Sequence, residues 1–387
     1  MAAILAEAGA FLDTVIDSMP SSTSMGRSSD AFDHRTMKHA TSRKSSPRAS
    51  RKAILVDFAL QGGGAHGAFA WGVLDRALEV PGIRVEGISG TSAGAMNAAV
   101  LADGYVEGGT EGARAALERF WRRVSDAARL SPLRRGPLDI LLGNWTLDNS
   151  PMFVAMDMAA RVLSPYDLGL AASNPLRDIL AESIDFRRLR KSPIKIFITA
   201  TNVQTGRGRV FRNAELSIDA LLASACLPTM YKAVEIDGET YWDGGYSGNP
   251  TITPLVRECN ASDTILVQVN PVHRPGTPRS ARDILNRVNE ISFNSPLVKE
   301  LRMIALLRKA SSPTKAESAL WARMRIHRIT SDWMVGLGSS SKLNAEWPFL
   351  QKLRDEGRRC AEAFMEAHGR DLGKRSSLDL DAFLEGV

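Results

Sequence analysis

The sequence predicts an α/β fold, a three-layer sandwich in which helices cover both faces of a mostly parallel sheet. Short apolar segments typical of buried strands alternate along the chain with longer segments that carry a helical pattern. Ala53–Leu60 is the first such strand, and His66–Val80 is a helix that is apolar on nearly every side. Because strands that alternate with helices form parallel sheets, these repeated units predict the sandwich.

Further elements complete the first half of the predicted fold. Ile83–Ile88 is expected to be the second strand, and helices follow at Ala93–Ala102 and Glu111–Ala127. Residues 130–150 combine prolines and a glycine with many apolar side chains. This composition favours a loop that covers a site or packs as a small satellite core.

The second half continues the alternation and ends in helices. Asp237-Gly238 between two short strand-like runs is a strong hairpin signal. The elements expected here are helices near 151–163 and 174–184, a strand at Ile194–Ala200 with Gly208–Phe211 as hairpin partner, a helix at Ser217–Ala225, hairpin strands at Tyr231–Ile236 and Thr240–Trp242, a strand at Thr264–Asn270, and helices near 280–292, 297–310 and 347–367.

The arm before the fold differs in composition from the rest of the chain. Residues 20–52 are rich in Ser, Arg and Lys and poor in apolar side chains, so we expect 1–52 to be a disordered basic tail. The arm supplies much of the formal net charge of +6. A solvated tail is favoured over an arm that binds nucleic acid or an anionic membrane.

Cysteine usage and hydropathy bear on the compartment. Cys226, Cys259 and Cys360 show neither metal-ligand spacing nor an even disulfide set, which suits a reducing, cytoplasmic environment. No apolar run approaches the roughly 18 residues that a membrane span needs. We therefore expect a cytoplasmic protein.

The most informative segment is Gly90-Thr91-Ser92-Ala93-Gly94, between an apolar strand and a helix of small residues. A serine with a glycine two residues away on either side occupies a tight, strained turn from strand to helix. Such a turn pushes the hydroxyl out to where a substrate can reach it. The segment therefore predicts a nucleophilic Ser92.

A glycine loop follows the first strand directly. Gly62, Gly63, Gly64 and Gly67 satisfy a dinucleotide-binding pattern, with Glu86 as the acid about 20 residues later. The same glycines can instead expose backbone N–H groups that stabilise an oxyanion. An exposed nucleophile after the next strand has no use in a dinucleotide site, so the oxyanion hole is favoured.

A serine nucleophile needs a base, and two candidates remain. His273 follows a late strand, where an α/β-hydrolase places its triad histidine. Asp243 instead precedes Gly244-Gly245 at the end of a hairpin strand. An unperturbed aspartate is a poor base at neutral pH, so Asp243 would have to be buried to raise its pKa.

Three motifs in this order resemble the patatin-like phospholipase family. They are the loop Gly62–Gly67, the Ser92 segment and Asp243-Gly244-Gly245, and the run Ser224-Ala225-Cys226-Leu227-Pro228 is also similar. The resemblance covers about 57–270. Where many members carry Arg or Lys, this chain has His66.

The resemblance implies hydrolysis of acyl esters in lipids by a Ser–Asp dyad. Ser92 would be the nucleophile and Asp243 the base, without a histidine, a metal or an organic cofactor. The implied oxyanion hole is Gly62, Gly63 and Gly64, and the supporting glycines are Gly67, Gly90, Gly94, Gly244 and Gly245. From the pattern of predicted elements we expect a catalytic domain at 53–270, with 271–387 as a mainly helical extension packed on it.

The expected partner is a lipid or membrane-surface ester, with peripheral membrane contact and without nucleic acid. Two alternatives from other classes stay open, namely a dinucleotide-dependent oxidoreductase and a lipid-binding scaffold without catalysis. A Ser-Asp-His esterase that uses His273 is the alternative within the hydrolases. The late cations Arg282, Arg287, Lys299, Arg302 and Lys309 either face anionic head groups or form a solvated surface.

Overall fold

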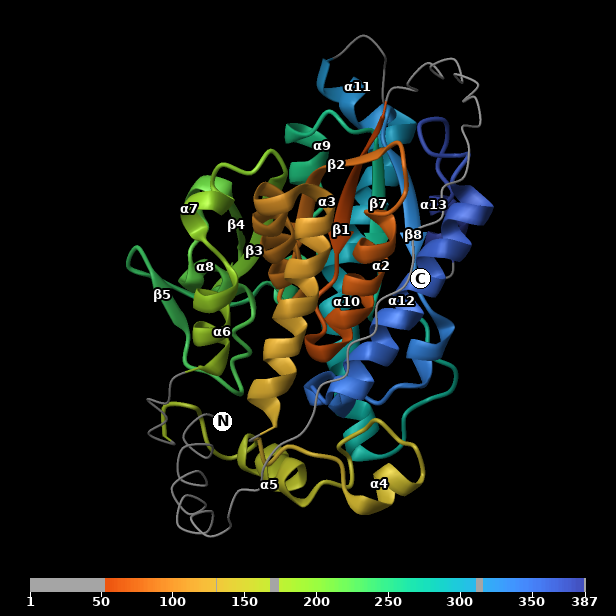
Figure 1. Cartoon of the computed structure of the whole chain (residues 1–387). Helices are drawn as coiled ribbons and strands as arrows, with labels where there is room; N and C mark the ends of the chain where they lie inside the picture. The colour runs from red at the N-terminus through yellow and green to blue at the C-terminus, as the bar shows by residue number, and fades with distance from the viewer. Residues whose placement is uncertain (1–52, 130, 168–173, 311–315, 386–387) are drawn as a thin grey trace, which may run out of the picture.

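The computed structural model describes residues 53–129, 131–167, 174–310 and 316–385 (Figure 1). The expected disordered tail at 1–52 lies outside the described residues. In the described part of the chain, one sheet of eight strands has the order β5-β6-β3-β2-β1-β7-β8, and β4 also pairs with β3. The strands are β1 (Ile54–Leu60), β2 (Ile83–Gly90), β3 (Lys195–Asn202), β4 (Gly208–Arg212), β5 (Val234–Ile236), β6 (Glu239–Asp243), β7 (Asp263–Val267) and β8 (Arg325–Ile329).

The central strands of the sheet are parallel, as predicted. β3, β2, β1, β7 and β8 run in the same direction, while β4 and β6 pair antiparallel with β3 and β5 pairs antiparallel with β6. The carboxyl ends of the parallel strands therefore meet at one edge of the sheet. The glycine loop after β1 and Ser92 after β2 both lie at that edge.

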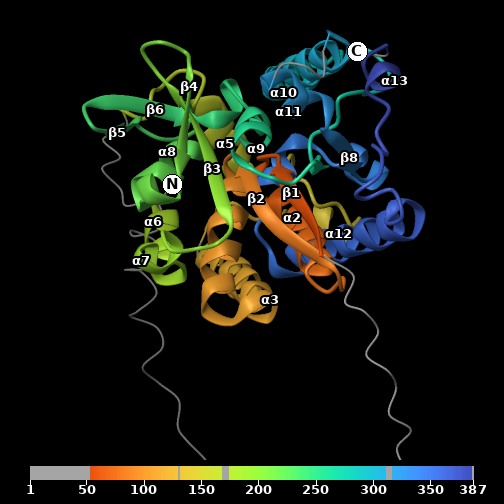
Figure 2. The same ribbon diagram turned by 90° about the horizontal axis from the view of Figure 1, so that it is seen from above.

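Helices cover both faces of this sheet, which confirms the three-layer prediction (Figure 2). One face carries α2 (Gly67–Ala77), α3 (Ala93–Ala128), α6 (Pro175–Ser183), α7 (Phe186–Leu189), α8 (Ile218–Ser224) and α12 (Trp347–His368). The other face carries α9 (Thr253–Glu258), α10 (Ala281–Ala310), α11 (Ala316–Ala322) and α13 (Leu380–Glu385). Alternation along β1 divides its side chains, with Phe58 facing the first core and Ala59 the second.

Helix α3 is one element interrupted by a sharp bend. Gly108 and Gly109 have non-helical backbone angles, and Gly109 has φ 62°. Gly104 lies against Ala113 and Ala116, so the second half of the helix turns back along the first. The two helices predicted at Ala93–Ala102 and Glu111–Ala127 correspond to these halves.

Two predictions differ from the structure in detail. Residues 130–150, expected to be a loop, contain the short helix α4 (Pro137–Leu141), and α5 (Pro151–Ala159) follows it. The two helices expected near 280–292 and 297–310 form the single helix α10, which continues through Pro296. The Ser295 hydroxyl donates to the Ile291 carbonyl in the turn before that proline. A side-chain hydrogen bond just before Pro296 thus accompanies the continuous helix.

The segment after residue 270 is joined to the same sheet. β8 pairs with β7, and α12 packs along α2, where Arg358 forms ion pairs with Asp75 and Glu79. The extension thus contributes a strand as well as helices. The domain boundary at 270 stays a prediction.

A buried carboxyl group in β1 gives the first testable consequence. Asp57 is fully buried, and burial, aided by the nearby Glu86, raises its pKa to about 8. The folded chain holds this proton while the unfolded chain loses it at acidic pH, so stability falls as pH rises toward 8. The wild type should therefore lose stability between about pH 5 and pH 8, and Asp57→Asn should not. The stability of the variant relative to the wild type should rise by roughly 3 kcal/mol over this range. Urea unfolding of both proteins at the two pH values measures the difference, and a pH-independent difference would contradict it.

Candidate active site

Ser92 occupies a strained turn between β2 and α3. Its backbone has φ 54° and ψ −121°, an angle pair that non-glycine residues rarely adopt. The side chain is half-buried. A strained, accessible serine at the carboxyl end of a central strand is the arrangement that a nucleophile elbow requires.

Small residues make this turn possible. The Gly94 Cα faces the Leu60 carbonyl so closely that a Cβ would collide with it, and Gly90 is packed equally tightly against Gly94. Gly67 lies against Ala93, with only 2.6 Å between the position of an added Cβ and the Ala93 Cβ. The elbow therefore tolerates no side chain at the positions where the sequence has glycine.

A second serine holds the backbone of Ser92. The Ser92 N–H donates to Ser224 Oγ at 2.9 Å, and the Ser224 hydroxyl donates to the Thr199 carbonyl at 2.7 Å. Ser224 ends α8 and is fully buried. Its contact with Ser92 was not predicted, because the sequence gives no local sign that two segments 132 residues apart meet.

The hairpin strand β6 brings Asp243 to the same edge of the sheet. Asp243 pairs with Ala200 of β3, the strand next to β2. Thr91 Oγ1 donates to the Gly248 carbonyl at 2.6 Å, which joins the turn after Asp243 to the turn before Ser92. The structure thus brings Ser92 and Asp243 together, close enough for the Ser92 side chain to affect the pKa of Asp243.

Burial changes the proton affinity of Asp243. Only 1% of the residue is exposed, and this burial raises its pKa to about 7. The hydrogen bond from the Gly245 N–H, at 2.7 Å, and the nearby Ser92 side chain oppose the increase. Asp243 therefore meets the condition that the sequence set for it, namely a carboxylate that can accept a proton near neutral pH.

The glycine loop lies directly against Ser92. A Cβ on Gly62 would stand 2.7 Å from the Ser92 Cβ, so the backbone of the loop reaches the serine. The Gly62 N–H donates to Asn249 Oδ1 at 2.7 Å and is therefore occupied. Within the described residues, the N–H groups of Gly63 and Gly64 make no hydrogen bond. These two groups are the available donors.

The other glycines after the elbow and the hairpin also fill tight positions. Gly244 packs against the Thr199 carbonyl, where a side chain would collide, and Gly245 packs against the Phe293 ring of α10. Phe293 in turn contacts the Tyr246 ring, with centroids 5.0 Å apart. Helix α10, from outside the region of the three motifs, thus forms one wall beside Asp243.

Among the described residues, neither His66 nor His273 makes a hydrogen bond with Ser92 or Asp243. His66 is buried, and its Nε2 lies 2.8 Å from Ser341 Oγ, while burial lowers its pKa well below the usual value. It packs against Phe349 as an uncharged structural side chain. His273 is exposed on the loop after β7, and no hydrogen bond links its ring to another described residue.

Glu86, the acid of the dinucleotide alternative, has a structural partner set. Its carboxylate accepts the N–H groups of Asn260 and Ala261 at 2.9 and 2.7 Å and pairs with Lys195 at 3.2 Å. These contacts fix the turn that precedes β7, at the amino end of the strands. Glu86 therefore lies away from the edge that carries Ser92.

The late cations are mostly paired within the protein. Arg282 contacts Asp148, Arg287 contacts Glu290 and Lys309 contacts Asp381. Lys299 is exposed on α10. These residues therefore do not form a continuous surface of unpaired cations for anionic head groups.

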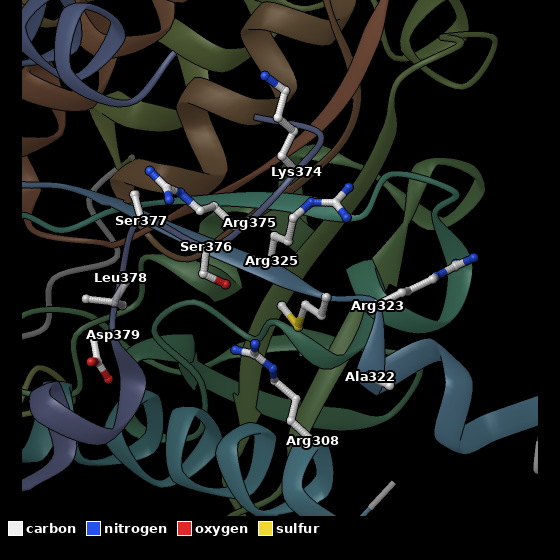
Figure 3. Close-up of a pocket in the computed structure, with 11 residues that line it drawn as sticks. Arg308, Ala322, Arg323, Arg325, Lys374, Arg375, Ser376, Ser377, Leu378 and Asp379 are labelled. Carbon is white, nitrogen blue, oxygen red and sulfur yellow. The ribbon is translucent and has the colours of Figure 1, made fainter. Parts of the chain in front are cut away.

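A separate surface cavity of ≈ 560 Å³ lies at the amino ends of the strands (Figure 3). Its lining includes the start of β8 and residues 374–379. Much of its positive charge is compensated, because Arg325 pairs with Asp263 and Arg375 with Asp371. It contains no predicted site residue and is not the place where Ser92 and Asp243 meet.

Comparison with known proteins identifies the class. A model of the patatin-like phospholipase family matches residues 58–256, just over half of the chain, and this range contains the elbow and the Asp243 hairpin. The chain therefore belongs to the patatin-like phospholipase family, and membership implies lipid acyl hydrolase activity. Among solved structures, the crystal structure of VipD from Legionella pneumophila is similar at 16% identity and a TM-score of 0.33, over 79% of this chain and 67% of that one. Curated proteins gave no match.

Among the described helices, none has both the length and the apolar character needed to cross a bilayer.

Proposed function

We propose that this protein cleaves acyl esters of lipids by covalent catalysis, with Ser92 as nucleophile and Asp243 as general base. The observation that carries the proposal is the proximity of a serine in a strained turn to a buried carboxyl group, whose pKa burial raises to about 7 and the Ser92 side chain lowers. Each feature alone has structural explanations. Their contact supplies a nucleophile and its proton acceptor at one point.

Acylation begins when Ser92 Oγ attacks the ester carbonyl carbon and Asp243 accepts the hydroxyl proton. The carbonyl oxygen becomes an oxyanion, which the N–H groups of Gly63 and Gly64 stabilise. The C–O bond to the alcohol then breaks, and protonated Asp243 returns its proton to the leaving oxygen. The products are a free alcohol and an acyl-serine.

Deacylation repeats these steps with water. Asp243 takes a proton from a water molecule, whose oxygen attacks the acyl carbon, and the oxyanion again forms at the glycine loop. Collapse releases the fatty acid and returns the proton to Ser92. Because the cycle restores both side chains, the proposal requires no added cofactor.

Exposed aliphatic side chains support a lipid as the substrate. Leu141 of α4 is 83% exposed and Leu142 is 62% exposed, and further exposed aliphatic residues line the first half of α10. Arg282 near the start of α10 donates to the Asp148 carbonyl, and the neighbouring Asn149 donates to Asp139 of α4, so α4 and the start of α10 adjoin. The exposed set is Leu138, Ile140, Leu141, Leu142, Ile284, Leu285, Val288 and Ile291. We propose that it contacts the lipid surface near the wall that Phe293 forms beside Asp243.

The test is release of fatty acid from phosphatidylcholine vesicles, triacylglycerol emulsions and a soluble short-chain ester by the full chain. The proposal expects hydrolysis in this panel, with aggregated lipid preferred over the soluble ester. Parallel titration with NAD(P)H, followed by its fluorescence, tests the dinucleotide alternative. Nucleotide binding without ester hydrolysis would overturn the proposal, and vesicle binding without hydrolysis would favour the non-catalytic scaffold.

The pH dependence of kcat/KM should follow Asp243. Only its ionised form can accept the Ser92 proton, and its pKa is raised to about 7, so kcat/KM should rise with pH through about 7. A histidine base would give a similar midpoint, which makes His273→Ala the necessary control. The rise of kcat/KM through about pH 7 should persist in His273→Ala. If the rise disappears in that variant, His273 is the base.

A further inference from the structure

The glycine loop is held from both sides by asparagine side chains. Asn249 Oδ1 accepts the Gly62 N–H, and Asn270 Nδ2 donates to the Gly62 carbonyl, each at 2.7 Å. Asn270 is buried and lies just beyond β7, outside the range that matches the family model. The two peptide units that flank Gly62 are therefore each held by an asparagine, and Asn270 holds the Gly62–Gly63 unit through its carbonyl.

This clamp sets the direction of a proposed oxyanion donor. A trans peptide is planar, so its carbonyl and the following N–H point in opposite directions. By fixing the Gly62 carbonyl, Asn270 fixes the Gly63 N–H on the other side of the same plane. The Gly63 N–H is one of the two groups without a hydrogen bond in the described part of the loop.

Lys342 completes the chain of hydrogen bonds. Its Nζ donates to Asn270 Oδ1 at 2.7 Å, and the 3-10 segment that carries it, Ser339–Leu343, packs over the loop. The Lys342 carbonyl lies so close to Gly64 that a side chain there would collide with it. Gly64 also has φ 57°, which glycine adopts without strain.

The hydrogen-bond partner of the Lys342 ammonium is Asn270, and the charged groups nearby have other partners. Among the described residues, no carboxylate lies within ion-pair distance of its Nζ. Burial lowers the pKa of Lys342 to about 8; Glu290 of α10 opposes this shift and Arg274 of the loop after β7 adds to it. Glu290 is itself engaged by Arg274 at 2.6 Å, and the facing His66 has its pKa lowered by burial.

We propose that Lys342 is a positioning residue for the oxyanion hole, acting through Asn270 on the Gly62–Gly63 peptide. The ammonium holds the Asn270 amide in the orientation that fixes the Gly62 carbonyl. It also polarises the chain of hydrogen bonds, which makes the Gly63 N–H a stronger donor. Lys342 thus supplies, from the C-terminal part of the chain, a cation behind the loop in which His66 carries no charge. This inference rests on the proposed function and adds to it.

The test compares Lys342→Met and Lys342→Arg with the wild type in steady-state kinetics on one ester. A well-placed oxyanion donor contributes about 10²–10³-fold to kcat, so weakening one should lower kcat by roughly 10–100-fold with little change in KM. Lys342→Arg should recover part of the loss. Lys309→Met, which removes an exposed lysine at the far end of α10, is the matched control and should keep wild-type kinetics.

Two readouts separate this role from a structural one. In wild type, kcat should fall above about pH 8 as Lys342 loses its proton, and this alkaline limb should vanish in Lys342→Met and move to higher pH in Lys342→Arg. In an Asn270→Ala background, Lys342→Met should add little further loss, since both act through one path.

Unchanged kcat in Lys342→Met, or equal losses in both backgrounds, would overturn the inference. If Lys342→Met does not fold, two other variants decide. The inference would be overturned by a Lys342→Arg protein whose alkaline limb does not move together with an Asn270→Ala protein that keeps full activity. Failure of the proposed function is distinguishable, because hydrolysis would then survive Ser92→Ala whatever residue stands at 342.

Discussion

Asp243→Asn is expected to lower kcat/KM by about 10³–10⁴-fold while leaving the protein folded. In the wild type, Asp243 Oδ1 accepts a hydrogen bond from the Gly245 N–H at 2.7 Å, and asparagine keeps an oxygen that can accept it. Asparagine cannot accept the proton of Ser92. The variant should therefore lose proton transfer and keep the shape of the turn.

The same substitution should make the protein more stable at neutral pH. Burial raises the pKa of Asp243 to about 7, so the folded state binds a proton that the unfolded chain releases at lower pH. The wild type therefore loses stability as pH rises from about 4 through 7, and Asp243→Asn should not. The gain at about pH 8 should be a few kcal/mol.

Activity assays and urea unfolding at about pH 8, on the same preparations, measure both effects. Asp237→Asn is the matched control, because Asp237 is an exposed aspartate in the turn between β5 and β6. It should change neither quantity by much. An active Asp243→Asn protein would rule out Asp243 as the base, and a less stable one would contradict the burial argument.

Ser92→Ala should abolish ester hydrolysis, with a loss of roughly 10⁵–10⁶-fold, because no other group then forms the acyl-enzyme. The backbone of the elbow should be preserved, since the N–H at position 92 still donates to Ser224 Oγ. Fatty acid release from vesicles measures the loss, and the unfolding midpoint checks the fold.

Ser183→Ala serves as the control for this variant, because Ser183 ends α6, away from the elbow. It should retain full hydrolysis. Lipid hydrolysis that persists in Ser92→Ala would mean that another residue is the nucleophile.

The parts of this fold that the sequence predicted are those with local signals. β1, β2 and the turn at Ser92 follow from apolar runs bounded by glycines, and the hairpin before Asp243 follows from Asp237-Gly238. The role of Asp243 as the base rests on the resemblance of Asp243-Gly244-Gly245 to the family motif. The burial of Asp243 follows from tertiary packing around β6 and α10, which the sequence does not display.

The polar framework behind the glycine loop could not be predicted in the same way. Asn249, Asn270 and Lys342 lie 187 to 280 residues from Gly62, and none sits in a spacing that marks a site. Only the return of the chain through β7 and over the loop brings them together. The same holds for Ser224: its segment resembles the family, but its hydrogen bond with Ser92 depends on tertiary packing.

The most direct test of the Ser92–Asp243 pair is labelling with a fluorophosphonate, followed by mass mapping of the adduct. A single adduct on Ser92 is expected in the wild type, with a labelling rate that rises with pH through about 7 and drops sharply in Asp243→Asn. An adduct on a different residue, or an unchanged rate in Asp243→Asn, would contradict the account.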